Sequence, residues 1–130
     1  MNQSFGELNI QAYTPHHPEG VTRTRLFDHE ELRAELVSMP PGTEIPVHVH
    51  EHAHELFDVI AGQGQIVVAG QELFGSPGKC VLVKAGTPHG LRNDTDQLWT
   101  VRITYQERIY ARQVGKLVGR AVRKRLGLVT

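Results

Sequence analysis

The sequence predicts an all-β domain followed by a basic C-terminal helix. Short runs of β-branched or alternating residues recur along the first 105 residues, and clusters of Gly and Pro separate them. From about Tyr105 onward, the apolar residues recur at helical spacing instead. A chain of 130 residues lies within the usual single-domain range of about 100 to 200 residues, so we expect one domain.

The predicted strands are seven short runs. They are LNIQAY (8–13), LRAELVSM (32–39), EIPVHVH (44–50), ELFDVI (55–60), QIVVAG (65–70), KCVLVK (79–84) and LWTVRITY (98–105). The segments that break them include PHHPEG, MPPG, AGQG, GSPGK and KAGTPHG. Seven or eight short strands at this spacing indicate an antiparallel sandwich or small barrel, not alternating β and α units.

The last element, residues 107–130, has the pattern of an amphipathic helix. Its apolar face holds Tyr110, Val114, Leu117, Val118 and Ala121, and its basic face holds Arg108, Arg112, Lys116, Arg120 and Lys124. From Glu107 onward there are seven bases and one acid, against seven bases and thirteen acids upstream. We therefore expect this basic helix to pack on its own acidic domain or on a dimer partner. The alternatives are a membrane surface or nucleic acid, but the apolar face is narrow and lacks Trp and Phe.

Composition excludes several classes of protein. Lys plus Arg equals Asp plus Glu at 14 each, so no global charge draws the chain to nucleic acid. The single cysteine, Cys80, excludes an intramolecular disulfide and multi-cysteine zinc motifs. The start has no signal-peptide pattern, and no apolar run approaches the 18 or so residues of a membrane span. A cytoplasmic location without a transmembrane segment is the expectation.

The stretch HVHEHAHE, residues 48–55, holds four of the eight histidines. Residues two apart on a strand face the same side, so His48 and His50 can aim two imidazoles at one point. Glu55 lies five residues after His50, so the chain must turn between them if both are to face the same side. We expect EHAH to form that turn, with Glu55, Phe57 and Val59 facing inward on the next strand and Asp58 facing outward.

Two imidazoles and a carboxylate suit one divalent transition metal, either Fe, Mn, Ni, Cu or Zn. A fourth ligand should come from elsewhere, and His89 in GTPHG is the best candidate because it follows a strand and a Gly/Pro turn. The alternative is that the histidines form a solvated polar turn without a metal. We expect His52 and His54 to be exposed in the turn, with a supporting role beside the site as the alternative.

Two segments resemble the cupin motifs. PGTEIPVHVHEHAHELFDVIAG fits the first motif, G-x5-H-x-H-x4-E-x6-G, from Gly42 to Gly62 without a gap. GKCVLVKAGTPHGLRN resembles the second, G-x5-P-x-G-x2-H-x3-N, at residues 78–93, with Lys84 where the family usually has proline. The match covers residues 42–93, and nine of the ten marked positions agree. The motif glycines are Gly42, Gly62, Gly78 and Gly86, and we expect a positive φ at these turns.

The resemblance implies a double-stranded β-helix, that is, a jelly-roll barrel, over residues 1–106. It implies that His48, His50, Glu55 and His89 are the ligands of one divalent metal in the barrel mouth. It also implies a small-molecule ligand or substrate, and a homodimer formed through an outer sheet, with no nucleic-acid partner. With Lys84 in place of proline, the turn lacks the restraint that a proline ring would give, but none of the four predicted ligands is put in doubt.

Function is less sharply indicated. A metal-dependent enzyme acting on a small polar molecule is the leading interpretation, and the resemblance favours an oxygenase, with an isomerase also compatible. The alternative is a non-catalytic module that binds a small ligand or senses metal. Glu55 argues against the thiol dioxygenase branch of the family, which typically lacks this ligand. No catalytic residue can be named.

Several residues that are not marked motif positions are also candidates for a pocket. Arg92, Arg102, Tyr105 and Tyr13 are candidates for lining it, although an ordinary surface or interface position is the leading interpretation for each. We expect Cys80 to be a buried, inert thiol and Trp99 to pack in the core.

Overall fold

The structure, a computed structural model, describes residues 4–15 and 19–107. The predicted basic helix at 107–130 lies outside these residues except for Glu107, so its packing stays a prediction. The elements are η1 (Ile10–Tyr13), β1 (Thr22–His29), β2 (Leu32–Met39), β3 (Glu44–His48), β4 (Ala53–Ala61), β5 (Gly64–Val68), β6 (Gln71–Gly75), β7 (Cys80–Val83), β8 (His89–Arg92) and β9 (Trp99–Glu107). No helix within the described ranges is long and apolar enough to cross a membrane.

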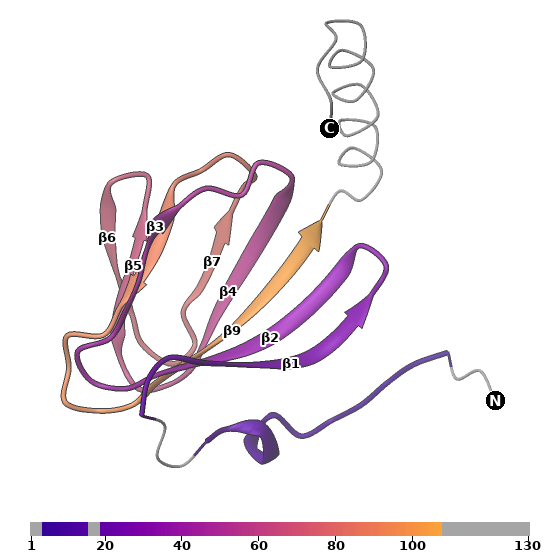
Figure 1. Ribbon diagram of the computed structural model, residues 1–130, viewed down its shortest axis with the longest axis horizontal. Coiled ribbons are helices and arrows are strands. Elements are labelled where there is room, and N and C mark those ends of the chain that lie inside the picture. Colours follow the sequence, from indigo (N-terminus) through magenta and orange to yellow (C-terminus); the bar gives the residue numbers. More distant parts are fainter. Residues whose placement is uncertain (1–3, 16–18, 108–130) are drawn as a thin grey trace, which may run out of the picture.

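Two antiparallel sheets face each other (Figure 1). The larger has the strand order β1-β2-β9-β4-β7 and the smaller the order β3-β8-β5-β6. From β2 to β9, consecutive strands lie in opposite sheets except for the β5–β6 hairpin, which is the arrangement of a jelly roll, and β1 adds an edge strand. The prediction of an all-β jelly roll is therefore confirmed.

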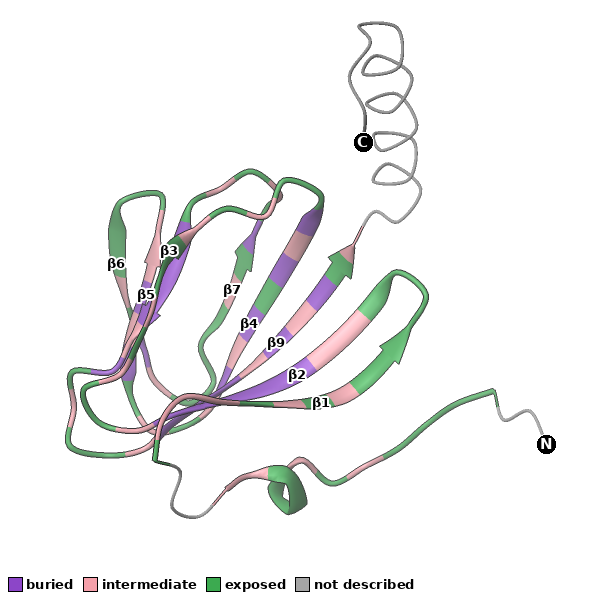
Figure 2. Ribbon diagram, viewed as in Figure 1, coloured by how far each residue is buried: buried purple, intermediate pink, exposed green. Residues whose placement is uncertain are grey.

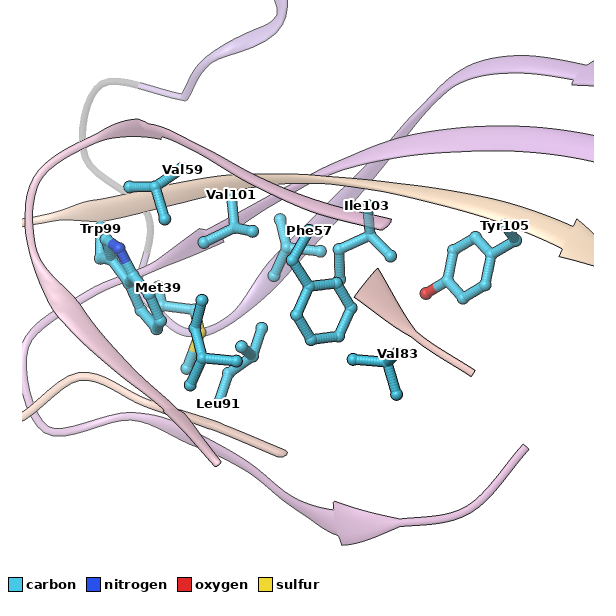
Figure 3. Close-up of a cluster of buried hydrophobic side chains, with 11 residues drawn as sticks. Met39, Phe57, Val59, Val83, Leu91, Trp99, Val101, Ile103 and Tyr105 are labelled. Atoms are coloured by element: carbon cyan, nitrogen blue, oxygen red, sulfur yellow. The ribbon is translucent and has the colours of Figure 1, made fainter. Parts of the chain in front are cut away.

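The inner face of the larger sheet changes character along its strands. At one end Trp99, Val101 and Met39 belong to the buried core, which side chains of the smaller sheet complete. Figure 3 shows the cluster running from Trp99 at one end to Tyr105 at the other. At the Tyr105 end, the register partners of Tyr105 are polar, with Arg33 on one side and Glu55 on the other. The interior is thus apolar at the Trp99 end and polar near Tyr105.

The register of β4 confirms the predicted facing of its side chains. Glu55, Phe57 and Val59 are buried at 2%, 1% and 4% exposure, whereas Asp58 faces the other side of the sheet and pairs with Arg102. Figure 2 shows this alternation as bands along β4. The turn is shorter than expected, because β4 already begins at Ala53.

Trp99 packs as predicted and is fully buried. Gly64 and Gly75 are paired across β5 and β6, and both lie against its ring. A Cβ on Gly75 would approach Trp99 Cζ2 to 2.8 Å, which a packed core does not accommodate without a shift. The positive φ predicted for the four motif glycines is also confirmed, with values from +77° to +92°.

Four elements were predicted wrongly or missed. The run at 8–13 is not a strand but contains the 3-10 helix η1, whose first turn is capped by Asn9 accepting a hydrogen bond from Gln11 N at 3.0 Å. Strand β1 was missed because Arg23 and Arg25 occupy positions where an apolar residue was sought. Strands β6 and β8 were also missed, and both are short.

Candidate metal centre

Strands β3 and β8 place two histidines directly opposite each other. His48 ends β3, His89 begins β8, and the two are register partners. His48 Nδ1 lies 2.8 Å from the Pro46 carbonyl, and His89 Nδ1 lies 2.8 Å from the Thr87 carbonyl. A carbonyl oxygen only accepts, so each Nδ1 carries a proton, and Nε2 is the ring atom that each histidine can offer to a metal. Hydrogen bonds of this kind orient metal-binding histidines and fix their tautomer.

His50 and Glu55 complete the group from two other positions. His50 follows β3, and its Nε2 lies 3.1 Å from His48 Nε2. Glu55 comes from β4 of the opposite sheet, with Oε1 at 3.6 Å from His50 Nε2 and Oε2 in contact with His89 Nε2. The predicted quartet is therefore brought together, although its role as a set of metal ligands stays a prediction.

The donor set fits a divalent transition metal. Ligand atoms of His48, His50 and His89 all lie within 4.8 Å of one another. Glu55 Oε2 and His89 Nε2 are buried against each other and have no other hydrogen-bond partner among the described residues. Three imidazole nitrogens and a carboxylate are ligands that Fe, Mn, Ni, Cu and Zn accept.

Burial and mutual charge shift the histidine pKa values in opposite directions. Burial lowers the pKa of His50 against the attraction of Glu55, and His48 and His89 lower it further. Burial also acts to lower the pKa of His89, but contact with Glu55 and the Thr87 carbonyl outweigh it and raise the pKa. His50 therefore stays neutral to lower pH than an ordinary histidine, and His89 keeps its proton to higher pH.

Backbone hydrogen bonds tie the two ligand segments together beside the site. Gly86 N donates to the His50 carbonyl at 2.9 Å, and Ala85 N donates to His54 Nδ1 at 2.9 Å. His54 is half-buried on β4, so its predicted exposure was wrong, and the alternative of a supporting role beside the site stays a prediction. His52 is exposed, as predicted.

An open cavity of about 550 Å³ adjoins the histidines. Its polar lining comes from β1, β2 and β9 and includes Arg23, Arg25, Arg33, Glu35 and Tyr105 as well as His48 and His50. Tyr105 was expected at an ordinary surface or interface position, but it is buried at 6% exposure. Its place on the inner face follows from the alternation of Trp99, Val101 and Ile103 along β9, a signal available in the sequence.

A hydrogen-bonded group at the cavity wall holds Tyr105 in place. The Tyr105 hydroxyl donates to Glu35 Oε1 at 2.7 Å, and Arg23 Nη1 donates to the same oxygen at 2.7 Å. Burial, together with the bond to Glu35, raises the pKa of Tyr105 well above its usual value. The hydroxyl is therefore a neutral donor at physiological pH.

The remaining candidates lie elsewhere. Arg92 pairs with Glu72 and Asp94 on the surface. Arg102 pairs with Asp58.

Tyr13 and Cys80 are exposed. The predicted burial of Cys80 was wrong, because its side of β7 faces Asp58 on the outer surface. A hydrogen bond to Asp58, aided by partial desolvation, raises the thiol pKa, so the thiol stays protonated near neutral pH.

Comparison with known proteins gives a family. The model of the family described as "Cupin domain" matches residues 35–104, which is more than half of the chain. A search of curated proteins found no match.

Solved structures share the fold. TT1209 from Thermus thermophilus is 24% identical, with a TM-score of 0.73, and the match covers 78% of this chain and 96% of that one. The DMSP lyase DddQ from Ruegeria pomeroyi DSS-3 is 23% identical, with a TM-score of 0.63, over 70% of this chain and 49% of that one. An oxalate oxidase in complex with the substrate analogue glycolate is 18% identical, with a TM-score of 0.61, over 71% and 53% of the two chains. With the family match, the jelly roll and the two motifs in agreement, the chain belongs to the cupin family.

Proposed function

We propose that this protein is a metal-dependent enzyme acting on a small polar molecule. One divalent Fe, Mn, Ni, Cu or Zn ion would be held by His48, His50, Glu55 and His89. The observation that carries this proposal is the convergence of four donors from both sheets at the edge of an open cavity. A substrate entering that cavity would lie next to the ion.

The ligand set leaves room for chemistry. A six-coordinate ion with four protein ligands keeps about two positions for water or substrate, where it can act as a Lewis acid or, if redox-active, support oxidation by O2. We include in this proposal that the reaction is of the oxygenase class. The protein's own contribution is orientation, because the Pro46 and Thr87 carbonyls hold two imidazoles in fixed tautomers. Phe57 and Ile103 supply apolar lining to the small pocket that His48, Glu55 and His89 also line.

Elemental analysis of the purified, untagged protein tests the metal site. We expect about one equivalent of one of these metals per chain, and its loss from a His50→Ala, His89→Ala double variant. A His29→Ala, His52→Ala double variant is the matched control, because both of these histidines are exposed and outside the quartet. A parent protein that holds no metal after being offered all five would refute the site.

Turnover separates an enzyme from a binding module. Oxygen uptake or substrate conversion that disappears in Glu55→Gln supports the enzyme. Tight binding of a metabolite by the metal-loaded protein without any conversion would instead assign the non-catalytic module.

The proposal includes a homodimer formed through the outer face of the larger sheet. Leu82, Leu56 and Phe27 are exposed at 58%, 37% and 41%, and the register places them in one row across that face, with Thr104 and Ala34 between Leu56 and Phe27. Exposed apolar rows of this kind are typical of protein contacts. Light scattering should give twice the chain mass for the parent and the chain mass for Leu56→Glu. A monomeric parent would contradict this part of the proposal.

A further inference from the structure

The cavity beside the histidines is lined by three arginines, and their pairing differs. Arg23 pairs with Glu35 at 2.7 Å, and Arg25 pairs with Asp28 at 3.0 Å. Arg33 has no such partner. Within the described part of the chain its side chain makes no hydrogen bond or ion pair, and its Nε is buried without an acceptor.

Arg33 is nevertheless held in place. Its guanidinium carbon lies 5.0 Å from the centre of the Tyr105 ring, and the two residues are register partners on β2 and β9. Stacking on an aromatic face suits a guanidinium and leaves its edge available for hydrogen bonds. Tyr105 is itself fixed by its bond to Glu35. The result is a positioned cation whose hydrogen-bonding capacity is unused.

The charges around the cavity favour an anion. Two of the three arginines are neutralised by their carboxylate partners, and Glu55 offsets only part of the charge of a divalent ion at the quartet. Arg33 therefore remains as one uncompensated positive charge next to a positively charged site. A single guanidinium is matched in charge and shape by one planar group with a single negative charge. A carboxylate is such a group, whereas a phosphate dianion carries more negative charge than one guanidinium balances.

From this geometry we infer that the ligand of the site is a small organic acid, bound with its carboxylate on Arg33 and another polar group toward the histidines. The inference rests on the proposed function for the part that faces the ion. The contact with Arg33 does not need the ion, because Arg33 is outside the quartet. The cavity of about 550 Å³ has room for such a molecule.

Calorimetric titration with malonate tests this inference, with malonamide as the neutral analogue and inorganic phosphate as the competing anion. We expect malonate to bind the metal-loaded parent and malonamide to bind at least about tenfold more weakly. Arg33→Gln should weaken malonate binding by about tenfold or more, and Arg33→Lys by less, because the lysine keeps the charge but not the planar fork. Arg92→Gln removes the same charge from a surface position outside the cavity, and should change binding by less than about twofold at 0.15 M ionic strength.

The same titration on the metal-free His50→Ala, His89→Ala variant separates the two proposals. Malonate binding by this variant that still weakens on Arg33→Gln would show that the contact with Arg33 does not need the ion. A parent that holds no metal after being offered all five, and whose malonate binding still depends on Arg33, would refute the metal site and keep the organic acid. A metal-loaded parent that binds malonate equally well after Arg33→Gln would overturn the inference and leave the metal site standing. Phosphate binding as tight as that of malonate, and equally dependent on Arg33, would overturn the assignment of a carboxylate.

Discussion

Replacing Asn93 with Ala should destabilise the protein strongly although Asn93 touches no proposed ligand. Its side chain is fully buried and makes four hydrogen bonds. Nδ2 donates to the Met39 and Gln97 carbonyls, both at 2.8 Å, and Oδ1 accepts from Thr95 N at 2.9 Å and Thr95 Oγ1 at 2.7 Å. The side chain thus joins the end of β2 to the turn between β8 and β9.

The magnitude follows from these contacts. Each bond contributes about 0.5–1.5 kcal/mol, and groups left buried without a partner cost more, so we expect a loss of about 3 kcal/mol in the free energy of unfolding. For a chain of this size, about 4 °C of melting temperature corresponds to each kcal/mol, which gives a decrease of about 12 °C. Asn93→Asp should be comparably destabilising, because the carboxylate keeps the acceptor but loses both donors.

Thermal unfolding followed by circular dichroism measures this change. Asp96→Ala, an exposed position in the same turn, is the control and should shift the melting temperature by no more than about 2 °C. Metal content should stay unchanged in folded Asn93→Ala, because Asn93 lies at the other end of β8 from His89. A melting temperature for Asn93→Ala equal to that of Asp96→Ala would refute the structural role assigned to this motif residue.

Three further predictions follow from the core, the cavity wall and the metal site. Gly64→Ala would drive its Cβ into the Trp99 ring and should cost about 1–3 kcal/mol in chemical denaturation, while Gly20→Ala, with nothing within 4 Å, should be near neutral; equal effects would contradict the packing. Tyr105→Phe removes the bond to Glu35 and should cost about 1.5–3 kcal/mol in the same assay, unlike Tyr13→Phe at an exposed site. Metal affinity should fall as pH decreases through the raised pKa of His89, because the ion must displace a proton from this histidine. Calorimetry in several buffers should show about one proton released per ion bound. An affinity that does not change between pH 8 and 6 would argue against His89 as a ligand.

The sequence predicted the convergence of His48, His50, Glu55 and His89 better than the cavity beside them. The spacing of His48 and His50 and the odd interval to Glu55 are local facts, and strand geometry converts them directly into a shared direction. The partner His89 needed only the pairing of β3 with β8. The buried face of β4 followed in the same way, since its inward positions are apolar apart from Glu55.

The arginine side of the cavity was not predicted because it breaks the rule by which strands are found. A strand is recognised by apolar residues on one face, but the inner face of β1 carries Arg23 and Arg25, which line an open cavity and are not in the core. Arg33 on β2 also lines this cavity, and it is the register partner of Tyr105 on β9. Their common location depends on long-range pairing between β1, β2 and β9, which one sequence does not reveal.

The hydrogen bond from Gly86 N to the His50 carbonyl and that from Ala85 N to His54 have a consequence for metal exchange. They tie the loop before His89 to the segment of His50 and, through the His54 side chain, to β4, and neither bond uses an atom that would bind the metal. Loading such a site requires dehydration of the ion and loss of a proton but no refolding. A bound metal would therefore be exchangeable in the folded state, and the occupancy of the site would follow the free metal concentration around the protein.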